Sequence, residues 1–117
     1  MMSIMKNHQV LTSKATVADS WGARLKGLLG KPSLSQNEAL ILDPCTCVHT
    51  FFMKFSIDVV FTNSRGEIVS LYSDLKPFRL TWLHWSAKTA IELSSGTIEK
   101  WHLKIGQVLT FNGDPHV

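Results

Sequence analysis

Cysteines, long apolar runs and export signals are scarce or missing in this sequence. Cys45 and Cys47 are the only two cysteines among 117 residues, and two thiols one residue apart do not supply the disulfide framework of a small secreted domain. No stretch approaches the roughly 20 apolar residues that cross a bilayer. Residues 1–10 also lack the charged, apolar and small-residue succession of a secretory signal. We therefore expect a cytoplasmic protein, without membrane attachment, whose thiols are reduced.

Clustered positive charge is missing as well. The 12 Lys and Arg residues outnumber the 9 Asp and Glu residues, which gives a formal net charge of +3, but they are scattered from Lys6 to Lys104. A nucleic-acid interface normally gathers such residues on one face or in one run. The pattern argues against nucleic-acid binding, while the small excess of cations favours acidic partners.

The length and composition are those of one globular domain. Hydrophobic residues make up 44% of the chain and charged residues 18%, so neither a disordered nor a fibrous protein is indicated. A chain of 117 residues buries enough surface for a single core. We expect one domain over residues 1–117, as a monomer or weak dimer.

One segment near the N-terminus has helical periodicity. Its apolar residues, which recur on one face, are Trp21, Leu25, Leu28 and Leu29. Thr16 is a suitable N-cap with Asp19 as its capping-box partner, and Gly30 followed by Pro32 ends the segment. The sequence predicts a helix over about 16–30, packed on the rest of the domain.

The remaining pattern is that of short strands. The expected strands cover 8–14, 39–42, 55–61, 67–72, 87–93 and 107–111. Alternation in 55–61 predicts a half-buried strand, and the turn signal from Asn63 to Gly66 predicts an antiparallel hairpin with 67–72. Thr97 is a suitable cap for a helical turn over 97–101. These features predict a mainly β, antiparallel sandwich or barrel-like fold.

Several motifs resemble one known family. The string from Val48 to Phe61, followed by Gly66, looks like the centre of domain of unknown function 192 (DUF192). Three shorter motifs in the same order support the resemblance: Arg24 with Gly27-Leu28-Leu29, Ile91-Glu92-Leu93 with Gly96, and Ile105-Gly106. Together they cover a core of about residues 15–111. The resemblance implies a compact β-sandwich-like domain and no established activity.

The sharpest chemical pattern is a Cys-x-Cys-x-His array. Cys45, Cys47 and His49 carry the thiol and imidazole ligands that hold zinc or a related metal. On a regular strand, side chains at i and i+2 lie about 6.6 Å apart, so three of them would need a bend to meet one ion. Pro44 and Thr46 are candidates for that bend, and a fourth ligand would come from His84, His102 or water. Zinc is therefore a candidate cofactor.

Two other interpretations of the same residues stand beside the metal site. If the strand register continues back from 55–61, Cys45, Cys47 and His49 face the core, which is where cysteine is often buried. This core interpretation is the favoured one. A Cys-x-Cys disulfide is also conceivable, and its tight ring would favour a redox role over a structural one.

A binding pocket is expected near the middle of the chain. Its candidate residues are His49, Met53, Lys54, Asp58, Arg79, Trp82 and Trp85. A structural pairing of Asp58, with Arg79 or Arg24 as the cation, is favoured over catalysis because no nucleophile, base and orienter occur together. Core packing is favoured for Trp82 and Trp85, although exposed rings would offer stacking platforms for sugars or peptides.

These observations rank three functions. The leading hypothesis is a non-catalytic module that binds a small ligand or a protein near residues 45–58 and 78–85. The alternative is a metal- or thiol-dependent enzyme or metal-binding protein that uses Cys45, Cys47 and His49. The third is carbohydrate binding by Trp82 and Trp85. Whether the chain is an enzyme is left open.

Overall fold

The computed structural model describes residues 2–18 and 33–113, in which seven strands and one short helix are found. The strands are β1 (Met2–Lys6), β2 (Gln9–Ala18), β3 (Glu38–Leu42), β4 (Ile57–Thr62), β5 (Ile68–Leu75), β6 (Thr89–Ser94) and β7 (Thr110–Gly113). The helix is α2 (Thr97–Lys100). The mainly β fold expected from the sequence is confirmed, and the described part of the chain contains no helix with the length and apolar content of a membrane span.

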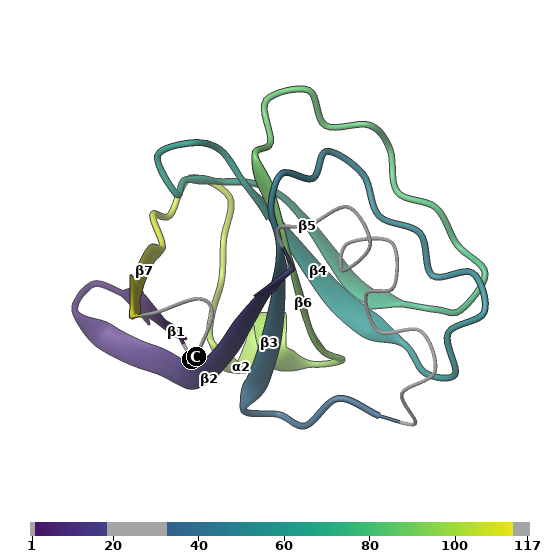
Figure 1. Cartoon of the computed structure of the whole chain (residues 1–117), viewed down its shortest axis with the longest axis horizontal. Helices are drawn as coiled ribbons and strands as arrows, with labels where there is room; N and C mark the ends of the chain where they lie inside the picture. The colour runs from purple at the N-terminus through teal and green to yellow at the C-terminus, as the bar shows by residue number, and fades with distance from the viewer. Residues whose placement is uncertain (1, 19–32, 114–117) are drawn as a thin grey trace.

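All seven strands join one sheet in the order β5-β4-β6-β3-β2-β1-β7 (Figure 1). Every described pair is antiparallel except β2 and β3, which are parallel. The sheet curls until its two ends approach each other. Glu67, just before β5, forms a bridge with Val108, which lies shortly before β7. The architecture is therefore a closed, barrel-like sheet.

Gly66 makes this closure possible. Its φ of +79° lies in the left-handed region, and a Cβ on this residue would stand 2.2 Å from the carbonyl oxygen of Leu109. The two residues are also joined by a hydrogen bond of 2.8 Å from the Leu109 amide to the Gly66 carbonyl. Only glycine combines this φ with so close a backbone approach.

Two apolar clusters lie on opposite faces of the curled sheet. The first fills its interior and takes residues from every strand and from α2, including Ile4, Ile41, Val60 and Ile91. The second lies outside β3, β4 and β6 and includes Ile57, Val59, Phe61 and Leu42. As a result all six residues of β4 are buried, so the predicted half-buried strand is wrong. A central strand covered on both faces loses the polar alternation of an edge strand.

Several boundaries differ from those expected. The first expected strand, 8–14, became part of β2, and His8 lies with Asn7 in the β1–β2 turn at positive φ. The hairpin of β4 and β5 is confirmed. The irregular stretch 78–85 is a loop, apart from a single bridge between His49 and Leu80.

Neither predicted helix is capped by the residue that the sequence suggested. Thr16 lies in β2 rather than at a helix N-cap, and residues 19–30 of the predicted helix lie outside the described residues. The short helix forms, but Gly96 rather than Thr97 is its N-cap and no side chain of its own caps it. The amides of Gly96 and Ile98 instead donate to the carboxylate of Asp58 in β4.

Candidate functional site

Two loop segments lie side by side along one flank of the barrel. Residues 44–56 lie in the connection from β3 to β4, directly after Asp43, and residues 76–88 connect β5 to β6 (Figure 1). Backbone hydrogen bonds run between them: Cys45 N to Lys88 O at 2.8 Å, His84 N to Thr46 O at 2.8 Å, Thr81 N to Val48 O at 2.9 Å and Thr50 N to Arg79 O at 2.9 Å. We call this pair of segments the aromatic ribbon.

Thr50 holds the far end of the aromatic ribbon together. Its side chain is fully buried; the hydroxyl donates to the Lys76 carbonyl at 2.6 Å and accepts from the Arg79 amide at 2.9 Å. Its carbonyl accepts from the amides of Met53 and Phe78. One threonine therefore provides hydrogen-bond partners for backbone groups on both segments. Without it, these groups would need water as their partner.

The face of the first segment that points inward is the reverse of the one predicted. Val48 and Thr50 are buried, whereas Cys47 and His49 are exposed and Cys45 is intermediate. The core interpretation is therefore wrong for Cys47 and His49. The register does not continue back from β4, because turns at 51–55 interrupt the extended chain.

The aromatic ribbon carries most of the exposed large hydrophobic side chains. Seven of the ten that are exposed in the described part of the chain belong to it: Phe51, Phe52, Phe78, Leu80, Trp82, Leu83 and Trp85. Trp82 and Trp85 are 81% and 83% exposed, so the expectation that they pack in the core is wrong. Isolated exposed hydrophobic residues are normal, whereas their concentration in two paired segments makes the aromatic ribbon a candidate interaction surface.

Two phenylalanines are held outward by an unusual backbone. Phe52 and Phe78 have φ angles of +65° and +62°, a left-handed conformation that bulky residues rarely adopt. Their rings meet edge to face at 5.6 Å between centroids, and Phe78 also lies 6.4 Å from Phe51. Strain of this kind costs about 1–3 kcal/mol per residue and is concentrated at functional sites.

Tyr72 and His84 fix the other end of the aromatic ribbon to the sheet. The Tyr72 hydroxyl lies 2.7 Å from Nε2 of His84 and accepts a bond from the Trp82 amide at 3.3 Å. The His84 ring contacts Phe61 of β4 at 4.7 Å between centroids. The sequence offered His84 only as a metal ligand and gave Tyr72 no role, because their meeting depends on the fold.

The predicted metal ligands are not brought together. The Cys45 thiol donates to the Cys47 carbonyl at 3.0 Å, neither cysteine is in a disulfide, and His49 instead stacks against Phe51 at 5.5 Å. Across residues 2–18 and 33–113, no three His, Cys, Asp or Glu side chains form a group suited to a metal ion. Zinc at this array stays a prediction that the geometry does not favour.

The predicted pocket residues divide into two sets. His49, Lys54 and Arg79 are exposed on the aromatic ribbon together with the two tryptophans. Met53 is buried in the outer apolar cluster and Asp58 is fully buried. The first set is exposed to solvent, whereas Met53 and Asp58 belong to the interior.

Asp58 is a structural residue. Its Oδ2 accepts from the amides of Gly96 at 3.1 Å and Ile98 at 2.8 Å, and its Oδ1 accepts from the Asp74 amide at 2.8 Å. The expected structural role is confirmed in kind, but the partners are backbone amides rather than an arginine. Asp58 thereby caps α2, whose first amides lack intrahelical partners.

The two segments of the aromatic ribbon contain only cations, and acidic residues flank them. Its two segments contain Lys54, Lys76, Arg79 and Lys88 and no Asp or Glu. Lys76 lies 3.1 Å from Asp74 and Lys88 lies 3.8 Å from Asp43, both acids being outside the segments. The pKa of Asp74 is held below its ordinary value by the Ser95 hydroxyl and by Lys76. The surface therefore combines apolar rings with cations.

A buried carboxyl group that the sequence gave no role lies in β6. Glu92 is 3% exposed, and its Oε2 has no hydrogen-bond partner among the described residues. Burial raises its pKa to about 7. Its neighbours across the sheet are Val59 and Leu40, which offer no polar group to stabilise a charge.

Comparison with known proteins identifies relatives by sequence. The family model DUF192, described as "Uncharacterized ACR", matches residues 2–111. A UPF0127 protein of Thermococcus sibiricus is 33% identical over 102 residues, covering 84% of this chain and 66% of the relative. A UPF0127 protein of Pyrococcus furiosus is 40% identical over 65 residues, covering 56% and 55%. The alignments thus span less than two thirds of either relative.

Solved structures share the fold. A protein of unknown function from Novosphingobium aromaticivorans DSM 12444 has a TM-score of 0.80 at 13% identity, covering 93% of this chain and 82% of the other. A Sinorhizobium meliloti 1021 protein, proposed to be a transcription regulator, has a TM-score of 0.79 at 15% identity, covering 94% and 91%. At such identities the likeness concerns the fold alone.

Proposed function

We propose that this chain, which belongs to the DUF192 family, is a non-catalytic module that docks a partner protein on the outer face of the aromatic ribbon. The observation that carries the proposal is the concentration there of seven exposed large hydrophobic side chains. Aromatic residues and arginine are enriched at protein interfaces, and a few such residues supply most of the binding energy.

The charge of the aromatic ribbon defines the chemistry of the partner. With Lys54 and Arg79 exposed and no carboxylate in either segment, the complementary surface is apolar with acidic residues at its edge. Charge complementarity of this kind steers association and selects partners. The long, narrow course of the two paired segments suits an extended acidic and apolar peptide segment.

The hydrogen bonds of the aromatic ribbon support a docking role. Thr50 holds one end and the bond between Tyr72 and His84 holds the other, so the backbone that carries the rings is already ordered before binding. Binding energy lost to ordering is a main reason that buried area fails to convert into affinity.

A cytoplasmic location belongs to the same proposal and is supported by the two thiols, which form no disulfide.

A defined peptide tests the proposal. The probe is a blocked 12-residue peptide that alternates Glu with Leu and Trp, compared with the same peptide carrying Lys in place of Glu. Binding of the acidic peptide should shift amide resonances of residues 76–88, and the double variant Trp82→Ala/Trp85→Ala should weaken it at least tenfold. Ile105→Ala is the matched control, because Ile105 is 66% exposed and lies outside the aromatic ribbon.

Competing ligands decide the partner class. Single-stranded DNA, an oligosaccharide panel and anionic vesicles are titrated in parallel, the first because a structural neighbour is proposed to be a transcription regulator. Protein docking is overturned if one of these shifts the same resonances while the acidic peptide does not. Concentration-dependent dimerisation that the tryptophan double variant abolishes would instead identify a second copy of this chain as the occupant.

A further inference from the structure

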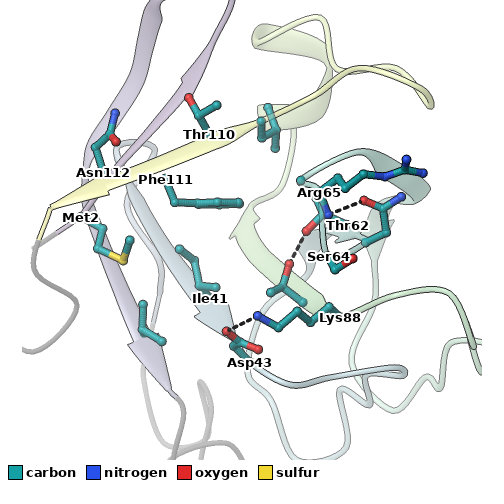
Figure 2. A pocket seen from close by; sticks show the side chains of 15 residues that line it. Met2, Ile41, Asp43, Thr62, Ser64, Arg65, Lys88, Thr110, Phe111 and Asn112 are labelled. Atoms are coloured by element: carbon teal, nitrogen blue, oxygen red, sulfur yellow. Dashed lines mark hydrogen bonds and ion pairs between the residues drawn. The ribbon is translucent and has the colours of Figure 1, made fainter.

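A recess lies at the end of the barrel opposite α2. Strand β4 begins beside the helix at Ile57 and reaches the recess at Thr62, while β6 runs the other way from Thr89. The β4–β5 turn, the end of β3 and the strand β7 complete its wall (Figure 2). Its volume is about 590 Å³, within the range of small-molecule sites, which occur preferentially at places such as barrel mouths.

The floor of the recess is apolar. Val17, Ile41, Leu109 and Phe111 line it, and all four belong to or pack against the interior cluster. Figure 2 shows Ile41 and Phe111 extending into the same space. A ligand that enters the recess would therefore bury a hydrocarbon or aromatic body against the open side of the barrel core.

The rim supplies a net positive charge. Lys88 and Arg65 line it with a single carboxylate, Asp43. The Lys88 ammonium lies 3.8 Å from Asp43, longer than a hydrogen bond, and its side chain is 56% exposed (Figure 2). Within the described residues, the side chain of Arg65 makes no hydrogen bond or ion pair. An anionic ligand group at Lys88 would accept a charge-assisted hydrogen bond, and bonds of this type are the strong ones.

We infer that this recess binds a small amphipathic carboxylate, with its apolar body on the floor formed by Val17, Ile41 and Phe111 and its carboxylate at Lys88. Opposite charge at the rim and hydrocarbon below it select a molecule with the same two parts. The recess shares Lys88 with the aromatic ribbon but is lined by none of the ribbon's seven exposed hydrophobic side chains, so this inference does not depend on protein docking.

The probe is decanoate below its micellar concentration. Its binding is measured by calorimetry and by shifts in the NMR resonances of Val17 and Ile41. Three comparators dissect the recognition: acetate lacks the tail, decanol lacks the charge, and decyltrimethylammonium reverses it. Decanoate should bind at least tenfold more tightly than each. Lys88→Gln should weaken decanoate about tenfold, whereas Lys104→Gln, an exposed lysine away from the recess, should leave it unchanged.

Two further variants locate the site. Val17→Phe fills the floor and should abolish decanoate binding, with folding checked by circular dichroism, and Lys88→Gln carries the test if Val17→Phe does not fold. Trp82→Ala/Trp85→Ala should leave decanoate binding intact. Equal binding of decyltrimethylammonium, full binding by Lys88→Gln, or loss of binding in the tryptophan variant alone would overturn the inference.

Discussion

The central strands β4 and β6 bury their hydrophobic side chains, whereas the aromatic ribbon exposes them. In β4 and β6 all twelve positions are buried and the strands are fully paired, so apolar side chains stabilise the fold. In the aromatic ribbon, seven large hydrophobic side chains instead face water. The difference shows that hydrophobicity alone does not place a residue inside, because the backbone pairing decides which face turns inward.

The largest effect that would sharpen this comparison concerns Asp58. Replacing Asp58 by Ala removes the acceptor for three amides, those of Gly96, Ile98 and Asp74, and should lower the free energy of unfolding by about 3–5 kcal/mol. Urea denaturation measures this loss. Asp58→Asn keeps one acceptor oxygen and should lose less. A loss below about 1 kcal/mol for Asp58→Ala would show that water replaces the carboxyl group at the cap.

Glu92 gives the next effect, and its direction depends on pH. Its folded pKa of about 7 lies above the unfolded value of 4.5, so the folded state binds more protons between these values and its stability falls as pH rises through that window. Glu92→Gln should match the wild type near pH 4 and exceed it by up to about 3 kcal/mol above pH 8. Urea midpoints across pH 4–8.5 measure the difference, and parallel curves for the two proteins would contradict it.

Gly66 tests the barrel closure. Gly66→Ala places a Cβ against the Leu109 carbonyl and should destabilise the fold by about 2 kcal/mol or more, since left-handed strain and a backbone clash combine. Gly106→Ala is the matched control, because Gly106 has a φ of +96° and open space around it. It should show only the strain, about 1 kcal/mol. Equal thermal shifts for both variants would mean that the close approach to Leu109 relaxes freely.

The smallest stability effects are expected in the aromatic ribbon. Cys47→Ser and Trp85→Ala remove exposed groups and should change the free energy of unfolding by no more than about 0.5 kcal/mol. Cys45→Ser should cost more, about 1 kcal/mol, because Cys45 packs against the outer apolar cluster. Thermal denaturation of the three variants gives the ranking. An equal, large loss for both cysteine variants would restore the core interpretation or point to a shared bound metal.

Part of the fold could be predicted from local sequence because local chemistry specifies it. Period-2 patterns and the turn from Asn63 to Gly66 gave the β4–β5 hairpin, and Thr97 marked the short helical turn. The start of β2 was found, but its end was assigned to the predicted helix, and β1 was missed. Both strands carry weak alternation, and β1 is held by pairing with β2 and β7. Non-local pairing of this kind leaves little signal in a short window.

The burial of the candidate residues was only partly predicted. His49, Lys54, Arg79, Trp82 and Trp85 are exposed on the two paired segments, so the expected burial of the tryptophans and of Cys47 and His49 was wrong. Turns at 51–55 break the register that the pattern assumed. Tyr72, Thr50 and Glu92 could not be assigned from the sequence, since their roles arise from residues distant along the chain.

The sequence by itself determined the mainly β class, the main hairpin, the family and the cationic, aromatic character of residues 44–56 and 76–88. Tertiary structure alone decided that β2 and β3 run parallel, that the sheet closes at Gly66, that Asp58 caps a helix 38 residues away and that the rings of the aromatic ribbon face water. The physical reason is that side-chain patterns record local preference, whereas burial and hydrogen-bond partners are settled only when distant strands pair.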